Sequence, residues 1–409
     1  MAVSLPPLPA LAPVAGVRLA TGPAGVRYPD RDDLVLVEIP ADAAVSAVFT
    51  RNRFRAAPVQ IAEARLGARA EVAPRYLLIN TGNANAGTGP EGRIAAERCC
   101  AAVAATSGVD AEAVLPYSTG VIGEALPAER IETAVPALFA NLDEAGWTRA
   151  AGGILTTDTA PKGVTVALSD GSGHVTGIAK GAGMIRPDMA TMLAFLATDV
   201  PVEPGLLDEM LRTAVNASFN RITVDGDTST NDAVTVIASG PGSVLDDPNA
   251  PRAIALAAAL REACTILAQS IVRDGEGATR FVTVDVGGGR SPEEALECAF
   301  TIAESPLVKT ALFAGDPNWG RILAAVGRAG IDDLDVDRVS IFLADETGEV
   351  RVAAAGGLAA EYREADGERV VSQESFTIRV DLGRGDAREV VWTTDLSHEY
   401  VRINAEYRS

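Results

Sequence analysis

Histidine and cysteine are scarce in this chain of 409 residues, which contains two histidines and four cysteines. The histidines, His174 and His398, stand in polar, turn-like stretches, so each is interpreted as a surface or packing residue and not as the general base of a catalytic triad. The sequence has no HExxH, no CxxC and no histidine cluster at ligand spacing, so no metal site is predicted. The cysteines, which include the adjacent pair Cys99 and Cys100, are expected to be the reduced thiols of a cytoplasmic protein.

Long runs without charge are also missing. Residues 1–17 are apolar but contain four prolines and no early positive charge, which fits neither a signal peptide nor a membrane anchor. No uncharged run elsewhere approaches the roughly 18 to 20 residues that a spanning helix needs. The formal net charge of -20 makes the average surface repel phosphate backbones and anionic lipids. A soluble, cytoplasmic protein is therefore expected, with neither nucleic acid nor a membrane as partner.

The sequence contains none of the usual glycine-rich patterns of phosphate-binding loops. The glycine-rich stretches 274–278 and 285–290 lack the GxGxxG and GxxxxGK[ST] patterns that place phosphates at a helix start. The stretch that begins at Arg149, RAAGGI, lacks the last glycine of the RxxGxG loop found in the common acetyl-CoA-binding acetyltransferase fold. These glycines are interpreted as tight turns, and no bound cofactor is predicted.

Strand-like and helix-like segments alternate along the chain. Short β-rich runs that end in Gly, Asp or Asn occur at 33–39, 75–82, 163–170, 221–226, 233–240, 280–289 and 338–345. Apolar residues at helical spacing predict helices at 205–219, 252–275 and 292–304. This mixture favours α/β layers, with long helical connections in the middle of the chain in preference to tight hairpins.

Three clusters of hydroxyl residues lie beside glycines or acidic residues at the ends of predicted strands: Asn80 to Gly82, Ser118 to Gly120, and Thr156 to Thr159. Such loops can direct backbone N–H groups and short side chains into one pocket. Each cluster alone is more often a capping or turn element.

The stretch 180–199, KGAGMIRPDMATMLAFLATD, resembles the ornithine acetyltransferase family, also called the glutamate N-acetyltransferases. The precursors of that family cleave themselves between Ala and Thr in an MATML element. The resemblance continues in order over almost the whole chain, through residues 49–52, 80–89, 118–123, 156–162, 219–232, 274–281, 305–322 and 400–409. Chance agreement over so many ordered segments is implausible.

The resemblance implies a layered α/β fold of the DmpA/ornithine acetyltransferase type, with sheets sandwiched by helices in an arrangement similar to the N-terminal-nucleophile hydrolases. It also implies cleavage between Ala190 and Thr191, which would give an alpha chain of residues 1–190 and a beta chain of residues 191–409. Cleavage would free an α-amino group, with a reference pKa of about 7.7 to 8.0, beside the hydroxyl of Thr191 that it can activate. Without the resemblance, Thr191 would be interpreted as the start of a buried strand.

The family's functional positions fall on named residues of this sequence. The oxyanion hole is implied at Thr119 and Gly120, and the nucleophile at Thr191. The positions that contact substrate are implied at Thr157, Lys180, Thr191, Glu276, Asn404 and Ser409.

The activity that the resemblance implies is a ping-pong transfer of acetyl from N2-acetyl-L-ornithine to L-glutamate through an acetyl-threonine. A bifunctional enzyme, which also acetylates glutamate from acetyl-CoA as co-substrate, is favoured over a monofunctional ornithine acetyltransferase. An α2β2 heterotetramer is expected. The alternatives are an N-terminal-nucleophile aminopeptidase or amidase, which uses water as acceptor, and a binding protein that is never cut.

Overall fold

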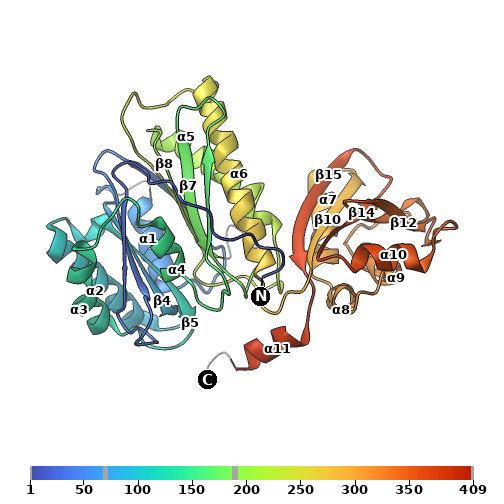
Figure 1. Cartoon of the computed structure of the whole chain (residues 1–409), viewed down its shortest axis with the longest axis horizontal. Coiled ribbons are helices and arrows are strands. Elements are labelled where there is room, and N and C mark those ends of the chain that lie inside the picture. Colours follow the sequence, from blue (N-terminus) through green and yellow to red (C-terminus); the bar gives the residue numbers. More distant parts are fainter. Residues whose placement is uncertain (1, 68–71, 187–191, 407–409) are drawn as a thin grey trace.

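The computed structural model describes residues 2–67, 72–186 and 192–406, and it contains three β-sheets. Figure 1 shows two bodies side by side, one built from the chain up to α6 and the other from β10 to β15. Thr191 and Ala190, where cleavage is expected, and Ser409 lie outside the described residues.

The first body contains a four-stranded sheet in the order β1-β2-β4-β5. Its strands are β1 (Arg18–Gly22), β2 (Leu34–Glu38), β4 (Tyr76–Asn83) and β5 (Val114–Val121). The neighbouring helices are α1 (Ala57–Leu66), α2 (Gly89–Ser107), α3 (Ala128–Phe139) and α4 (Trp147–Gly153). Strands β4 and β5 run parallel, so their carboxyl ends meet at one edge of the sheet.

A five-stranded sheet in the order β3-β9-β8-β7-β6 forms the second layer of strands. Its strands are β3 (Ala44–Phe49), β6 (Lys162–Ala167), β7 (His174–Lys180), β8 (Leu193–Thr198) and β9 (Ala233–Ala238). Helices α5 (Pro204–Asn216) and α6 (Pro251–Arg273) cover its outer face. Strand β7 pairs antiparallel with β8, with Lys180 opposite Leu193, so segments from both sides of the expected cleavage position share one sheet.

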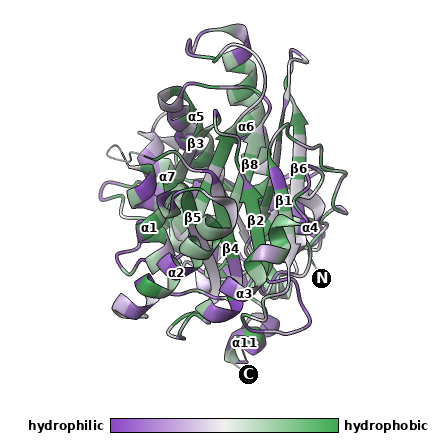
Figure 2. Cartoon of the chain, turned by 90° about the vertical axis from the view of Figure 1, so that its left-hand side faces the viewer, coloured by the Kyte–Doolittle hydropathy of each residue, from purple (hydrophilic) through white to green (hydrophobic). Residues whose placement is uncertain are grey.

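Alternation of side chains explains why these sheets stack. Leu34 and Leu36 of β2 face the cluster under α2 and α3, whereas Val35 and Val37 face the second sheet, where Phe195 of β8 lies. Strands β2 and β8 are accordingly coloured as hydrophobic at the centre of Figure 2. The order of layers is therefore helix, sheet, sheet, helix, which confirms the predicted layered α/β fold with sheets sandwiched by helices.

The second body is a six-stranded sheet in the order β13-β12-β11-β14-β10-β15 with helices packed against it. Its strands are β10 (Phe281–Gly289), β11 (Ser340–Asp345), β12 (Gly348–Ala354), β13 (Gly357–Leu358), β14 (Ser375–Asp381) and β15 (Ala387–Thr394). Its helices are α7 (Pro292–Ala303), α8 (Pro306–Ala314), α9 (Trp319–Gly327) and α10 (Glu364–Val371). After β15 the chain leaves this body, and α11 (His398–Ala405) lies beneath the first body (Figure 1).

Two expectations from the sequence are wrong. Residues 221–226 do not form a strand. Thr223 N donates to Trp392 O at 3.0 Å, whereas Val224 N donates to Ile185 O at 2.7 Å. Because these hydrogen bonds go to two separate segments, they do not form the ladder of a β-sheet. The middle of the chain also contains a hairpin, because β6 and β7 pair antiparallel through a short turn.

Helix α6 is, by length and composition alone, long and apolar enough to cross a membrane. Within the fold, 50% of its apolar window is buried, and it packs against α5, β6 and β7. It is a core helix of the first body.

Candidate active site

A cavity of about 260 Å³ lies where the two sheets of the first body meet the loop after α6 and the end of α11. Of the residues predicted from the sequence, six line it: Thr119, Gly120, Thr157, Lys180, Glu276 and Asn404. Met192, the first described residue after the expected cleavage position, lines the same cavity. Positions far apart in the chain are thus brought together at one place.

Thr119 and Gly120 lie at the carboxyl end of β5, against the end of β4. Gly120 has φ +135°, and a Cβ atom there would lie 2.5 Å from the backbone nitrogen of Asn83. Only glycine allows this close approach of two backbones, so the sequence Thr-Gly is required by the packing of β4 and β5.

Lys180 ends β7 and is 8% exposed. Its Nζ donates to Thr119 Oγ1 at 3.2 Å, and this bond leaves the hydroxyl proton of Thr119 free to donate elsewhere. Burial lowers the pKa of the Lys180 ammonium below its ordinary value, although the carboxylate of Asp158 opposes that effect. Lys180 therefore offers an incompletely compensated positive charge to an anionic group in the cavity.

A fully buried ion cluster lies behind the cavity wall. Lys162 Nζ is 2.7 Å from Asp158 Oδ1 and 2.6 Å from Asp274 Oδ2, and all three side chains are 0% exposed. Asp158 Oδ1 also accepts from Gly181 N at 2.7 Å, while Asp274 Oδ2 accepts from Thr159 N at 3.0 Å. Burial alone would raise the pKa of Asp158, but the charges of Lys162 and then Lys180 hold it well below its usual value. The cluster ties together the segments that carry Thr157, Lys180 and Glu276.

Glu276 is 7% exposed, and its Oε2 accepts from Asn404 Nδ2 of α11 at 2.8 Å. A Cβ atom on Gly183 would lie 2.5 Å from Glu276 Cδ, so the glycine leaves room for this carboxylate. Helix α11 is held to the first body by two further bonds, from Ser397 Oγ to Gly277 O at 2.6 Å and from Tyr400 Oη to Asp225 Oδ2 at 3.2 Å. Among its described lining residues the cavity thus combines one cation, carboxylates and a strand-end hydroxyl, which suits the recognition of an amino acid and the stabilisation of an oxyanion.

Comparison with known proteins agrees with the resemblance seen in the sequence. The model of the ArgJ family matches residues 18–409. The chain belongs to the ArgJ family. The arginine biosynthesis bifunctional protein ArgJ of Pseudomonas fluorescens is 55% identical to it over 413 aligned residues that cover 100% of both chains. The ArgJ protein of Pseudomonas syringae pv. tomato is 53% identical, again over 100% of both chains. The crystal structure of the ArgJ protein from Bacillus halodurans is 35% identical, with a TM-score of 0.48, and covers 52% of this chain and 98% of its own.

Asp232 lines the cavity of this ArgJ-family chain and was not singled out from the sequence. It lies directly before β9 and is 3% exposed, and burial raises the pKa of its carboxyl well above the usual value. The available signal was the polar run TSTND at 228–232 in front of a strand whose residues are all buried.

Neither histidine lines this cavity. His174 pairs with Asp199 at 3.1 Å between Nδ1 and Oδ2, and the ring of His398 contacts that of Phe313 at a centroid distance of 5.5 Å. Among the described residues no group of three or more His, Cys, Asp and Glu could hold a metal ion.

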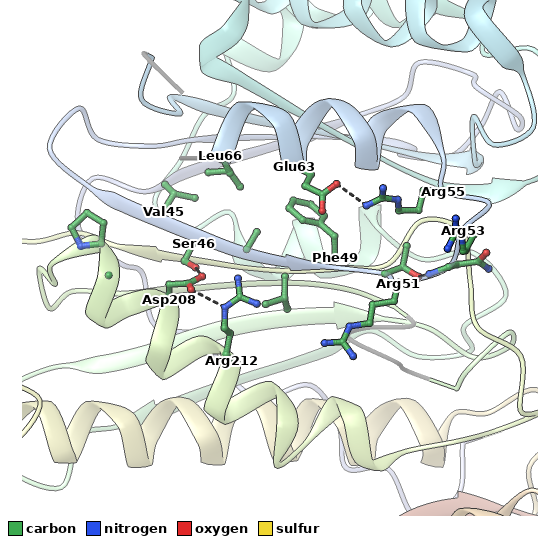
Figure 3. A pocket seen from close by; sticks show the side chains of 17 residues that line it. Val45, Ser46, Phe49, Arg51, Arg53, Arg55, Glu63, Leu66, Asp208 and Arg212 are labelled. Carbon is green, nitrogen blue, oxygen red and sulfur yellow. Dashed lines mark hydrogen bonds and ion pairs between the residues drawn. The ribbon is translucent and has the colours of Figure 1, made fainter. Parts of the chain in front are cut away.

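A larger hollow of about 1140 Å³ lies along the edge strand β3, between α1 and α5 (Figure 3). Four arginines line it: Arg51, Arg53, Arg55 and Arg212. Arg55 pairs with Glu63 and Arg212 with Asp208, each at 2.7 Å, as Figure 3 shows. None of the predicted site residues lines this hollow, so the smaller cavity is the candidate active site.

Proposed function

We propose that the chain is an acetyltransferase of arginine biosynthesis that moves acetyl from N2-acetyl-L-ornithine to L-glutamate. The observation that carries the proposal is the convergence of Thr119, Gly120, Lys180, Glu276 and Asn404 on one cavity. Full-length identity of 55% to a protein named for arginine biosynthesis supports the pathway.

The nucleophile is Thr191, set free when the precursor cuts itself after Ala190. The alpha chain is then residues 1–190 and the beta chain residues 191–409. The two chains would then share the five-stranded sheet, because β3, β6 and β7 precede the cut and β8 and β9 follow it. Strand pairing between Lys180 and Leu193 would hold the two chains together after cleavage.

In the first half-reaction, Thr191 Oγ bonds to the acetyl carbonyl carbon and gives its proton to the α-amino group of the same residue. The carbonyl oxygen becomes an oxyanion that Gly120 N–H and the Thr119 hydroxyl stabilise, each donor contributing a few kcal/mol. The C–N bond then breaks, and the departing ornithine amine takes the proton. Acetyl remains on Thr191.

In the second half-reaction, the amine of glutamate attacks the acetyl carbon, and the bond between that carbon and Thr191 Oγ then breaks. The proton that the glutamate amine loses passes through the α-amino group to Thr191 Oγ. Lys180 pairs with the substrate carboxylate, because its buried charge lacks full compensation. Glu276 and Asn404, joined by a 2.8 Å hydrogen bond, orient the amine, with Thr157 and Ser409 as further substrate contacts. Covalent storage of acetyl lets one cavity serve both amino acids in turn.

Acetyl-CoA is a second donor, in line with the word bifunctional in the names of the relatives. No cofactor stays bound. The enzyme acts in the cytoplasm as an α2β2 heterotetramer, without nucleic acid or membrane as partner.

An exchange assay tests the function. The purified enzyme, given N2-acetyl-L-ornithine and labelled ornithine without glutamate, should form labelled acetylornithine, because a ping-pong enzyme completes its first half-reaction alone. Glutamate should then give N-acetylglutamate from acetylornithine and, in a separate incubation, from acetyl-CoA. Hydrolysis of peptide p-nitroanilides without glutamate-dependent turnover would contradict the proposal and favour an aminopeptidase.

A further inference from the structure

Lysine is rare in this chain and is confined to its interior. Of the 35 lysines and arginines only three are lysines, Lys162, Lys180 and Lys309, and their exposed fractions are 2%, 8% and 3%. An arginine keeps its charge in any environment, whereas the pKa of a buried lysine changes readily with its neighbours. Lys180, which lines the cavity, is therefore a side chain whose charge the surrounding residues can set.

Asp158 holds the two segments that carry Thr157 and Lys180. Its Oδ2 accepts from Thr156 N at 3.1 Å, and its Oδ1 accepts from Gly181 N at 2.7 Å. Thr157 lies between Thr156 and Asp158 in the sequence, and Lys180 directly precedes Gly181. One carboxylate, itself 0% exposed, thus fixes the backbone next to two residues that line the cavity.

The charges behind the cavity wall do not cancel without Lys180. The buried cluster of Asp158, Asp274 and Lys162 has two carboxylates but one ammonium. A buried charge is unfavourable unless an opposite charge or hydrogen-bond donors compensate it. Lys180 supplies a second ammonium, and among the described carboxylates Asp158 attracts it most strongly. The cluster and Lys180 therefore stabilise each other's charges.

We propose that Asp158 is the positioning residue that keeps the Lys180 ammonium charged and directed at the carboxylate of the amino-acid substrate. This inference rests on the proposed function, in which Lys180 binds that carboxylate. Asp158 acts through Lys180 and not on the substrate, because its oxygens accept from Lys162, Gly181 and Thr156 behind the wall. It thus sets a charge and a direction and does not enter the chemistry.

The proton on Lys180 is balanced by groups from several elements. The charged residues that act on it are Asp158 in the loop after α4, Lys162 of β6, Asp232 before β9 and Glu276 after α6. The carboxylates favour the ammonium, whereas burial and the like charge of Lys162 favour the neutral amine. Burial has the largest effect, so the pKa of Lys180 is below its ordinary value. Removing the charge of Asp158 should lower this pKa further.

The test measures the proton on Lys180 directly, by NMR of protein labelled at the ε-carbon of lysine. Three lysines give three signals, and Lys180→Met identifies the one that belongs to Lys180. Asp158→Asn keeps the size of the side chain and removes its charge, so the Lys180 signal should titrate about one to three pH units lower than in the wild type.

Asp274→Asn is the matched control. Asp274 bonds to the same Lys162 at 2.6 Å and is equally buried, but it is not among the charges that act most strongly on Lys180. If Asp158 only stabilised the cluster, both variants would change Lys180 alike. The inference predicts the smaller shift in Asp274→Asn.

Transfer kinetics give a second measurement. In Asp158→Asn, the basic limb of kcat/KM for acetylornithine should move down with the Lys180 signal, because only the ammonium binds the substrate carboxylate. The carboxamide of acetylornithine lacks that carboxylate, so the wild type should prefer the acid by about 10- to 100-fold. Above the new limb, Asp158→Asn should lose most of this preference, which a general loosening of the fold would leave in place.

A Lys180 midpoint that stays in place in folded Asp158→Asn would overturn the inference, and so would an equal shift in Asp274→Asn. If Asp158→Asn does not fold, the wild type decides. The Thr156 amide, which donates to Asp158, should then change shift over the Lys180 titration more than the Thr159 amide, which donates to Asp274, and equal changes would refute the pairing. A wild-type enzyme that transfers no acetyl would instead refute the proposed function, and the NMR titrations would still decide whether Asp158 sets the charge of Lys180.

Discussion

Replacing Lys162 with methionine would leave two fully buried carboxylates, Asp158 and Asp274, without the ammonium that bridges them at 2.7 and 2.6 Å. Breaking a buried ion pair by removing one partner costs about 3–5 kcal/mol, which is a large share of the roughly 5–15 kcal/mol that holds a protein folded. The cluster also ties the segments that carry Thr157 and Lys180. Lys162→Met should therefore lower both stability and acetyl transfer.

The loss should depend on pH. In the wild type, the pKa of Asp158 is lower in the folded protein than the value of about 3.9 in the unfolded chain. Its contribution to the free energy of unfolding is therefore fully present above the unfolded pKa and is lost as pH falls through the folded pKa. Without Lys162 the two carboxylates repel and bind a proton more readily, so their folded pKa values rise. The difference in free energy of unfolding between the wild type and Lys162→Met should therefore shrink as pH falls from about 7 to about 4.

Urea unfolding monitored by circular dichroism at several pH values measures this difference in stability. Hydrogen exchange of the Thr159 and Gly181 amides, which donate to Asp274 and Asp158, reports the loosening locally. Arg93→Met is the control, because Arg93 pairs with Glu97 at 3.0 Å with side chains 54% and 46% exposed, and such pairs contribute less than about 1 kcal/mol. A midpoint shift in Lys162→Met no larger than that of the control would refute the reasoning.

Three other substitutions test separate parts of the account. Gly120→Ala places a Cβ 2.5 Å from Asn83 N at φ +135°, so the ends of β4 and β5 must move apart. The urea midpoint should fall and kcat should drop by about 10²–10³, and an unchanged kcat would remove Gly120 from the oxyanion site. Lys180→Met removes a charge-assisted bond of about 1.5–3 kcal/mol, so kcat/KM for glutamate should fall by about 10- to 100-fold, and an unchanged value would place the carboxylate elsewhere. Burial lowers the pKa of Lys309 to about 8, whereas the pKa of a lysine in the unfolded chain is about 10.4. The folded protein is therefore most stable above the unfolded pKa, where the amine is neutral, and it loses stability as pH falls through about 8. Lys309→Met should flatten the urea midpoints between about pH 8 and 10, and a slope equal to that of the wild type would contradict this assignment.

The elements that depend on local pattern could be predicted from the sequence. Strands β2, β4 and β9 and helices α5, α6 and α7 lie within a few residues of the predicted ranges, because each has a clear apolar period and a glycine or proline near its end. The run at 221–226 has the same apolar alternation, but its N–H groups bond to two separate segments. Periodicity reports which side chains are buried and not where the backbone finds its partners.

The gathering of the site residues could not be predicted from spacing. Thr119, Lys180, Glu276 and Asn404 came from the family resemblance, and the layers of the fold place them around one cavity. The partner of Lys162 at Asp274 is separated from it by 112 residues, so no local pattern indicates that pair. Asp232 was missed for a similar reason, because its alignment with Met192 depends on the parallel pairing of β8 with β9.

The mass of the purified protein under denaturing conditions tests the central claim most directly. The wild-type enzyme should give two polypeptides, residues 1–190 and 191–409, and Thr191→Ala should give one inactive chain of all 409 residues. An active wild-type enzyme that remains a single chain, or a Thr191→Ala variant that is still cut, would contradict the account.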